Sequence, residues 1–436
     1  MTQATENGPP SEPSAGQRRR GPLSIIFFTI LLDLLGFGMI LPLLPFYALT
    51  YGASALEIGL LSSVYSLGQF LFAPFWGQLS DRWGRRRVLL VTIFATSIAH
   101  LLLALAPSLW MLFLARAAAG IFAANYSTAQ AYVADVTTGK DRAKGMGLVG
   151  AAFGLGFVLG PAMGAILAEV GGHVAVPLAA AALSLLNFVL AVVRLPESLP
   201  PEARHTGEER FRLRWFDFRG LEEGSEAADG GGGEGRKRSL IWLLALVFLV
   251  VFAFSAMESM LALFCEERFG FGVKETGLLL VFIGVLMVII QGGLIGRLTH
   301  RFGERALILT GIVVMMAGLA LLPLAFNLGL LLLFSALLAI GSGLYTPSIP
   351  ALISRLTSAG RQGATLGLTR SPSSLARAVG PFWGGWMFEH LGPEWPFWGS
   401  SVVMVLALVL GVWVLAGWRS ATPASGGALS TVPVDE

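Results

Sequence analysis

Twelve long apolar runs, separated by short polar segments, constrain this sequence more than any other feature. A helix needs about 20 mainly apolar residues to cross a bilayer, and each run is close to that length. We therefore predict an all-α membrane protein with twelve transmembrane helices, at roughly 24–48, 56–79, 87–106, 109–135, 145–169, 174–194, 239–264, 275–296, 305–325, 329–353, 363–388 and 396–417.

Composition supports the same class. Of the 436 residues, 55% are hydrophobic and 13% are charged, whereas about 25% of a soluble domain is charged. The chain has one cysteine, so no internal disulfide can form.

A glycine- and arginine-rich sequence between the second and third runs recurs later in the chain. Residues 77–87 (GQLSDRWGRRR) have a degenerate copy at 296–305, 219 positions on, and Gly160–Gly164 (GPAMG) recurs as Gly380–Gly384 (GPFWG), 220 positions on. Nearly equal offsets indicate two copies of one six-helix unit. Transporters built in this way place the substrate site where the repeats meet.

The polar segments divide the chain at the middle and at both ends. The middle segment contains many charges and a run of four glycines, and it cannot bury enough apolar surface to fold. We predict a disordered cytoplasmic tail (1–22), an N-terminal six-helix half (23–194), a cytoplasmic linker (195–238), a C-terminal six-helix half (239–418) and a cytoplasmic tail (419–436).

Basic residues set the predicted orientation, because cytoplasmic loops are enriched in Lys and Arg. One set of loops contains nearly all of them, including Arg82, Arg85 to Arg87, Arg297 and Arg301, whereas the other set contains only Arg268 and Lys274. We therefore expect a multi-pass protein of the cell's inner (plasma) membrane with both termini in the cytoplasm. The anionic inner leaflet explains the basic loops, so we predict no nucleic-acid partner.

The first copy of the repeated sequence is predicted to form a gate. Gly77 would let the second span approach another helix closely, and Gly84 would permit a tight reversal. Asp81 would lie where other helices begin, where a carboxylate is stabilised by unpaired N–H groups, and Arg85 and Arg86 would bridge to acids such as Asp135. We expect these contacts to form when the halves close on the inner side and to break when they open. The predicted gate comprises Gly77, Asp81, Arg82, Gly84, Arg85, Arg86 and Asp135.

At these residues the chain resembles the major facilitator superfamily, whose loop between spans 2 and 3 has this Gly-x-Leu-x-Asp-Arg-x-Gly-Arg-Arg pattern. Leu114–Gly120 is similar to the family's arginine-containing motif of span 4, and Gly156–Gly164 to a span 5 motif of twelve-span drug:proton antiporters. Asp33–Gly38, with Pro42 and Pro45, is similar to the first span of tetracycline exporters. The resemblance implies two six-helix halves that rock about a cavity lined by spans 1, 4, 7 and 10.

Small residues follow one face of the fifth span. Gly156, Gly160 and Gly164 are spaced by four, which allows close helix packing, and Pro161 removes one backbone hydrogen bond and bends the helix. Gly380, Pro381 and Gly384 repeat the arrangement. We expect both segments to act as hinges at the boundary between the halves.

Five charged residues lie within the apolar runs: Asp33, Arg116, Glu258, Arg370 and Arg377. Each costs about 2.5–3.5 kcal/mol to insert, so such groups normally face a partner or a watery cavity. Asp33 and Arg116 fall at similar depths, and we predict that they pair and that Asp33 binds the coupling proton. Glu258 is a second candidate proton site. Arg377 either neutralises it or contacts an anionic substrate, and the role of Arg370 is open.

Polar residues in the predicted spans are candidates for substrate contacts. We assign Asn125, Tyr126, Gln130 and Gln291 to the substrate cavity, together with Arg377. The histidines have no metal-ligand spacing, and no nucleophile with an adjacent base is visible. We therefore predict no metal, no cofactor and no enzymatic activity.

The predicted function is secondary active transport. Without a phosphate-binding loop, the energy source is an ion gradient, which supplies about 2.3 kcal/mol per charge per 100 mV. We expect proton-coupled efflux of lipophilic or amphipathic small molecules by a monomer. The alternatives are a symporter or uniporter for a metabolite such as a sugar or organic anion and, more remotely, a membrane receptor or scaffold that transports nothing.

Overall fold

The computed structural model describes residues 15–123, 125–137, 139–199, 233–356 and 370–416. Within these ranges all regular secondary structure is helical. The first half contains α1 (Ala15–Leu49), α2 (Ala55–Trp83), α3 (Arg85–Ala104), α4 (Leu109–Phe122), α5 (Asn125–Val136) and α6 (Gly139–Arg194). The second half contains α8 (Gly233–Phe269), α9 (Val273–Ile289), the π-helix η2 (Ile290–Leu294), α10 (Ile295–Leu321), the 3-10 turn η3 (Leu322–Leu324), α11 (Leu328–Leu356), α13 (Arg370–Leu391) and α14 (Trp395–Ala416).

Two apolar stretches each hold two spans joined at a glycine. Gly147–Arg194 and Val273–Leu324 have 48 and 52 residues, about twice the length that a bilayer requires. Each reverses at a glycine with positive φ, Gly172 (φ 69°) and Gly303 (φ 76°). Each of these two stretches therefore counts as two spans, whereas α4 and α5 together form one. Counted in this way, the helices provide the twelve predicted spans. The predicted fold class is therefore confirmed.

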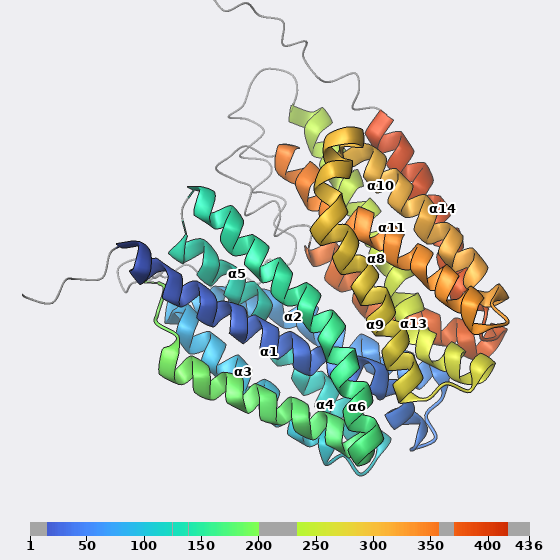
Figure 1. The fold of residues 1–436 in the computed structure, drawn as a ribbon, viewed down its shortest axis with the longest axis horizontal. Helices are drawn as coiled ribbons and strands as arrows, with labels where there is room; N and C mark the ends of the chain where they lie inside the picture. Colours follow the sequence, from blue (N-terminus) through green and yellow to red (C-terminus); the bar gives the residue numbers. More distant parts are fainter. Residues whose placement is uncertain (1–14, 124, 138, 200–232, 357–369, 417–436) are drawn as a thin grey trace, which may run out of the picture.

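The spans form two bundles that lie side by side (Figure 1). We call the end where α6 finishes and α8 begins the linker end, and the end where α1 finishes and α2 begins the far end. Contacts between the bundles are carried mainly by α2 with α13 and by α6 with α9. In Figure 1 the bundles touch near the lower ends of α9 and α13 and diverge toward the linker end.

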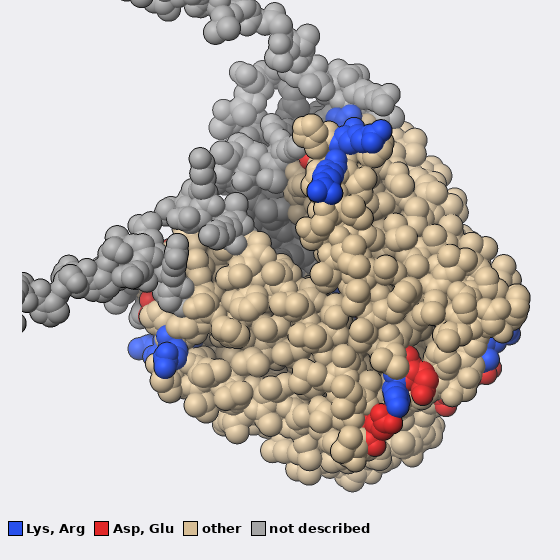
Figure 2. Space-filling model, viewed as in Figure 1, with Lys and Arg blue, Asp and Glu red and all other residues tan. Residues whose placement is uncertain are grey.

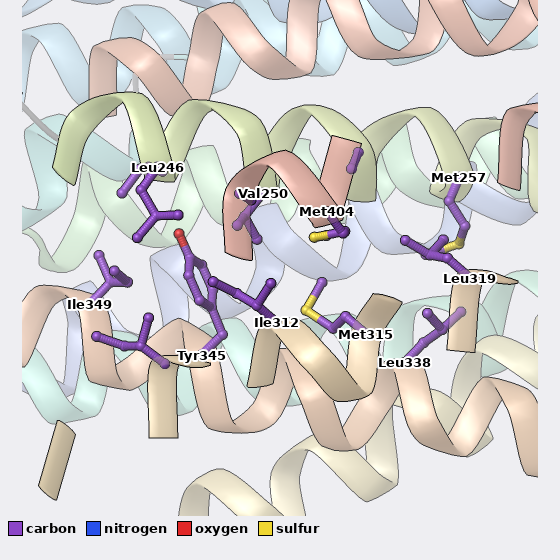
Figure 3. Packing of buried hydrophobic residues seen from close by; sticks show 14 of the residues in the cluster. Leu246, Val250, Met257, Ile312, Met315, Leu319, Leu338, Tyr345, Ile349 and Met404 are labelled. Carbon is purple, nitrogen blue, oxygen red and sulfur yellow. The ribbon is translucent and has the colours of Figure 1, made fainter. Parts of the chain in front are cut away.

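The second half buries a large apolar core of its own, whereas the far-end core of the first half also includes Met260 and Leu263 of α8. In the second half, α8 contributes Leu246 and Val250, α10 contributes Ile312 and Met315, and α14 contributes Met404, all at most 4% exposed (Figure 3). Burying a side chain of this size stabilises a fold in water by about 1.5–3 kcal/mol, but in lipid the gain comes from close packing.

Charged side chains are concentrated at the two ends of the visible face (Figure 2). Most of the surface between them is uncharged, as expected of a helical protein surrounded by lipid tails. Large apolar side chains such as Val170, Trp110 and Val193 are exposed. These exposed residues are explained by contact with lipid rather than with water.

The structure changes some of the predicted boundaries. Helix α1 begins at Ala15, so residues 15–22 are helical rather than part of a disordered tail. Residues 195–199 pack on the first half, where Leu195 is 2% exposed, and α8 starts at Gly233 within the predicted linker. The remaining linker residues and the tail 419–436 lie outside the described residues.

Candidate functional site

A cavity of about 70 Å³ lies between the two halves, on the far-end side of the molecule. Helices α1, α2 and α4 line it from the first half, and α8, α9 and α13 from the second. Its polar lining consists of Ser62, Tyr65, Ser66, Arg116, Ser255, Glu258, Ser259, Thr276 and Arg377, and its apolar lining includes Phe37, Leu41, Pro42, Pro45 and Leu280. Two of the predicted coupling residues therefore face one shared space.

Arg116 is held over an aromatic ring. Helices α2 and α4 approach closely because Gly68 and Gly120 lie between them, and a Cβ at Gly120 would overlap the backbone oxygen of Tyr65. One turn before Gly120, the Arg116 guanidinium carbon lies 4.3 Å from the centre of the Tyr65 ring. Arg116 is 5% exposed, and a desolvated cation–π contact stabilises such a charge by about 2 kcal/mol.

Asp33 lies on α1, one helical turn before Phe37, which lines the cavity. It is partly exposed, and Tyr65 experiences the charges of Asp33, Arg116 and Arg377 together. Among the described residues, the Arg116 Nε has no hydrogen-bond partner. The direct Asp33–Arg116 pair stays a prediction.

Glu258 and Arg377 form an ion pair within the second half. The Arg377 Nη1 donates to the Glu258 Oε2 at 3.4 Å, and the side chains are 41% and 18% exposed, respectively. The pair joins α8 to α13 and borders the cavity opposite Arg116. Of the two roles open for Arg377, this structure shows the neutralising contact.

Two of the other predicted cavity residues do not line this cavity. Gln130 on α5 and Gln291 in η2 are partly exposed, but neither lines it. Asn125 and Tyr126 belong to α5, and their side chains lie outside the described residues, as does that of Arg370. Helix α11, which contains span 10, contributes no described residue to the lining, because it packs on α10 and α9.

Tyr65 and the serines of α2 and α8 were not predicted from the sequence. Tyr65 is also 5.4 Å from Phe37, measured between ring centres, so it connects the Arg116 charge to an aromatic wall. A serine or tyrosine in an apolar helix carries little signal by itself, because serine is common at helix contacts in membranes. The usable signal was the regular spacing of Ser62, Tyr65 and Ser66, which places them on one helix face.

Arg85 is the centre of a network at the linker end. Its Nε donates to Asp135 Oδ2 at 3.1 Å, and its Nη1 contacts Asp81 and Ser80. Gly84 has a φ of 100°, so the predicted reversal is confirmed. Arg86 donates to the backbone oxygen of Val192 at 2.8 Å.

A carboxylate outside the predicted motif completes this network. Glu197 Oε1 accepts from the backbone N–H of Arg85 at 2.8 Å and of Arg86 at 3.4 Å, which stabilises the start of α3. Asp81 is in the last turn of α2, and its predicted place near the start of another helix stays a prediction. At the start of α3 the carboxylate is Glu197, which the sequence did not predict.

The gate residues differ from the prediction in two ways. The Arg85–Asp135 pair lies wholly within the first half and is present although the halves diverge at this end, so it does not depend on their closure. A Cβ on Gly77 would meet nothing within 4 Å, so Gly77 makes no close approach here. Arg82 also belongs to α2, and the gating role of this network stays a prediction.

The glycine face of span 5 packs within the first half. A Cβ on Gly156, Gly160 or Gly164 would lie 2.5–2.7 Å from Leu34, Gly38 or Met39 of α1. The prediction of close packing is confirmed, but the partner is α1 and not the other half.

In the second half, Gly380 and Gly384 pack on α8 in the same way. The boundary between the halves lies on another face of each helix, at Pro161 of α6 and Pro381 of α13. A Cβ on Gly277 would be 3.1 Å from the Pro161 oxygen, and one on Gly59 would overlap the Pro381 oxygen.

Comparisons with known proteins agree with this arrangement. The model of the Major Facilitator Superfamily matches residues 26–295 and 292–431. The chain is 35% identical to the class C tetracycline resistance protein of Escherichia coli, covering 82% of this chain and 87% of that one. It is 29% identical to multidrug resistance protein 2 of Bacillus subtilis, with 88% and 93% covered. A crystal structure of the human organic anion transporter MFSD10 superposes with a TM-score of 0.69, at 27% identity, covering 92% of this chain and 100% of that one.

Proposed function

Because this chain belongs to the major facilitator superfamily, a family of membrane transporters and not of enzymes, we propose that it is a proton-coupled exporter of lipophilic or amphipathic small molecules. One observation carries this proposal. The cavity between the halves combines an apolar and aromatic wall with Arg116 from one half and the Glu258–Arg377 pair from the other. A rearrangement of the halves therefore changes the surroundings of charged groups on both sides of the site.

The apolar wall suits an amphipathic substrate. Phe37, Leu41 and Leu280 provide contact area, while Tyr65 and the serines provide hydrogen-bonding groups. The enclosed 70 Å³ is smaller than the roughly 300–1,000 Å³ of a drug-sized site. A drug-sized substrate therefore needs space beyond this enclosed part, in the direction in which the halves diverge. Relatives named for tetracycline and multidrug resistance favour this substrate class.

Proton coupling is assigned to Asp33, Arg116 and Glu258. A carboxylate that faces a confined cavity can take up a proton in one conformation and release it in another, when its charged neighbours change. Protonation of Asp33 would alter the field at Arg116, so that substrate and proton binding become mutually exclusive. A proton gradient then biases two conformations that are nearly balanced in free energy.

The linker end is proposed to face the cytoplasm of the cell, across its inner (plasma) membrane. The network of Arg85, Arg86 and their neighbours lies at this end, in agreement with the distribution of basic residues along the chain. In this orientation, the two halves diverge toward the cytoplasm and are in contact toward the outside (Figure 1). This is the conformation that an exporter needs in order to load substrate.

Transport by reconstituted protein tests the proposal. Proteoliposomes loaded with a fluorescent lipophilic cation or with tetracycline would be subjected to a pH gradient, and substrate and proton fluxes recorded together. We expect uphill substrate movement that collapses with the gradient. We expect Asp33→Asn to retain downhill exchange but to lose uphill transport. Uphill transport that persists in Asp33→Asn, or substrate flux without proton flux, would contradict the proposal.

A second candidate is transport of an organic anion. Arg116 is buried and lines the cavity between the halves. It therefore offers a positive charge to a ligand, and the resemblance to a protein titled as an organic anion transporter agrees. The same proteoliposomes distinguish the two candidate functions, because a fluorescent organic anion would be taken up only if the protein transports organic anions. Arg116→Gln should abolish that uptake.

A further inference from the structure

Glu389, near the end of α13, reaches across to the other half at the far end. Its Oε2 accepts a hydrogen bond from the backbone N–H of Leu56 at 2.9 Å. Leu56 is in the first turn of α2, where backbone N–H groups have no partner within the helix and a negative charge is stabilising. Glu389 of the second half therefore caps a helix of the first half.

Glu169, on α6, makes the reciprocal contact. Its Oε1 lies 2.7 Å from the Nζ of Lys274, and both side chains are about half exposed, at 55% and 51%. Lys274 is in the first turn of α9, so a glutamate of the first half contacts the start of a helix of the second half. These contacts connect the same helix pairs that carry most of the boundary between the halves.

The two contacts occupy corresponding positions in the two repeats, although one partner is a backbone N–H and the other a lysine ammonium. Glu389 follows Glu169 by 220 positions, and Lys274 follows Leu56 by 218 positions. The receiving helix ends match as well: Glu57 accepts from the Ser54 N–H at 2.8 Å, and Glu275 accepts from the Gly272 N–H at 2.9 Å. The duplication therefore preserves both the glutamate and the structure on which it docks.

Close backbone packing lies directly beneath each contact. Gly59 faces the Pro381 oxygen, Gly385 faces Ala55, and Gly277 faces Pro161 and Ala165. In addition, Ser63 Oγ accepts from the Phe382 N–H at 3.0 Å. This packing demands that the helices meet in one register, and the glutamates at the rim fix that register.

We propose that Glu169 and Glu389 are positioning residues of the transport cycle, a paired latch that holds the far end closed. Both contacts join the halves, so both must break before the far end opens. Because they are exposed to solvent, each is worth only about two- to fivefold in the ratio of closed to open forms. Two contacts of this strength favour the closed far end and can still break in every cycle. The latch would act whatever the substrate is and whether or not transport is coupled to protons.

Spin-label distances test the latch directly. Cysteines would be introduced at Ser108 and Phe326 for the far end, or at Arg194 and His300 for the linker end, all of which are exposed. The natural Cys265 is 0% exposed and should not react. In lipid nanodiscs, we expect Glu169→Gln and Glu389→Ala each to raise the ratio of long to short far-end distances about two- to fivefold. The double variant should show roughly the product, and the linker-end distance should shorten in step.

Two matched variants separate a latch from general loss of charge. Glu394→Gln removes an ion pair with Arg268 (3.6 Å) at the same end, but both partners belong to the second half, so it should not change the distances. The exchange Glu169→Lys with Lys274→Glu should restore the wild-type ratio. Unchanged distances in the Glu169→Gln and Glu389→Ala double variant, or an equal shift in Glu394→Gln, would overturn the proposal. These distance measurements use no substrate and no gradient. Failure of the latch proposal would therefore leave the proposed transport function untouched, and failure of the transport test would leave the latch untouched.

Discussion

The guanidinium of Arg116 lies 4.3 Å above the ring of Tyr65, at the point where α4 crosses α2. Gly68 and Gly120 bring the two helices together, so the contact follows from two positions without side chains. The ring stabilises a buried positive charge and leaves the guanidinium edge available to a ligand or a carboxylate. Substitutions at Tyr65 can therefore test the role of Arg116 in transport without changing any charged residue.

Replacing Tyr65 by leucine should impair transport, whereas phenylalanine should not. Loss of the ring removes about 1–2 kcal/mol of stabilisation from the buried cation, which corresponds to about five- to thirtyfold in kcat/KM. Phenylalanine retains the ring face. Initial rates in proteoliposomes at low substrate measure the effect, and Leu67→Ala, on an exposed position of the same helix, is the control. Equal losses in both Tyr65 variants would assign the effect to the hydroxyl instead.

Removing one partner of the Glu258–Arg377 pair should destabilise the protein more than removing both. The pair is partly buried, so its cost lies between the roughly 0–1 kcal/mol of exposed pairs and the 3–5 kcal/mol of buried ones. We expect about 1–2 kcal/mol for Arg377→Gln, with partial recovery in the double variant Glu258→Gln with Arg377→Gln. Thermal unfolding followed by tryptophan fluorescence gives the coupling energy, and simple additivity would show that the two residues act separately.

Adding one methyl group to the face of α6 that packs on α1 should be costly. A Cβ on Gly160 would lie 2.7 Å from the Cα of Gly38, so the helices must separate, at a cost of about 1–3 kcal/mol. Gly160→Ala should therefore lower the unfolding temperature of purified protein. Gly150→Ala on the same helix meets open space and should leave that temperature unchanged. A similar decrease in both variants would point to an effect other than this contact.

Glu197 should contribute as much to the stability of the linker-end network as Arg85 and Arg86, whose backbone N–H groups it binds. Glu197→Ala leaves the first N–H groups of α3 without their acceptor, and losing a cap costs about 0.5–2 kcal/mol. Glu197→Gln keeps an oxygen acceptor and should lose less. Hydrogen exchange at the start of α3 reports this directly, and unchanged protection in Glu197→Ala would remove the residue from the network.

The sequence predicts those features that depend on the spacing of residues along a single helix, or on a residue type that is rare in apolar helices. The twelve spans and the Gly84 reversal follow from local patterns, and Glu258 and Arg377 were identified because charges are rare in apolar helices. The rotation of each helix about its axis depends on its neighbours, so Gln130 and Gln291 were assigned to a cavity that they do not line. Tyr65 required the approach of α2 to α4, and Glu197 lies 112 positions from Arg85, beyond the reach of any local pattern.

Proton release on substrate binding is the most direct measurement of the central claim, that substrate and proton exclude each other in the cavity between the halves. Purified protein in weakly buffered detergent solution would be titrated with a transported substrate, and a pH indicator would report the released protons. We predict stoichiometric release by the wild-type protein and none by Asp33→Asn, with substrate binding retained. Binding without proton release in the wild-type protein, or undiminished release in Asp33→Asn, would contradict the account.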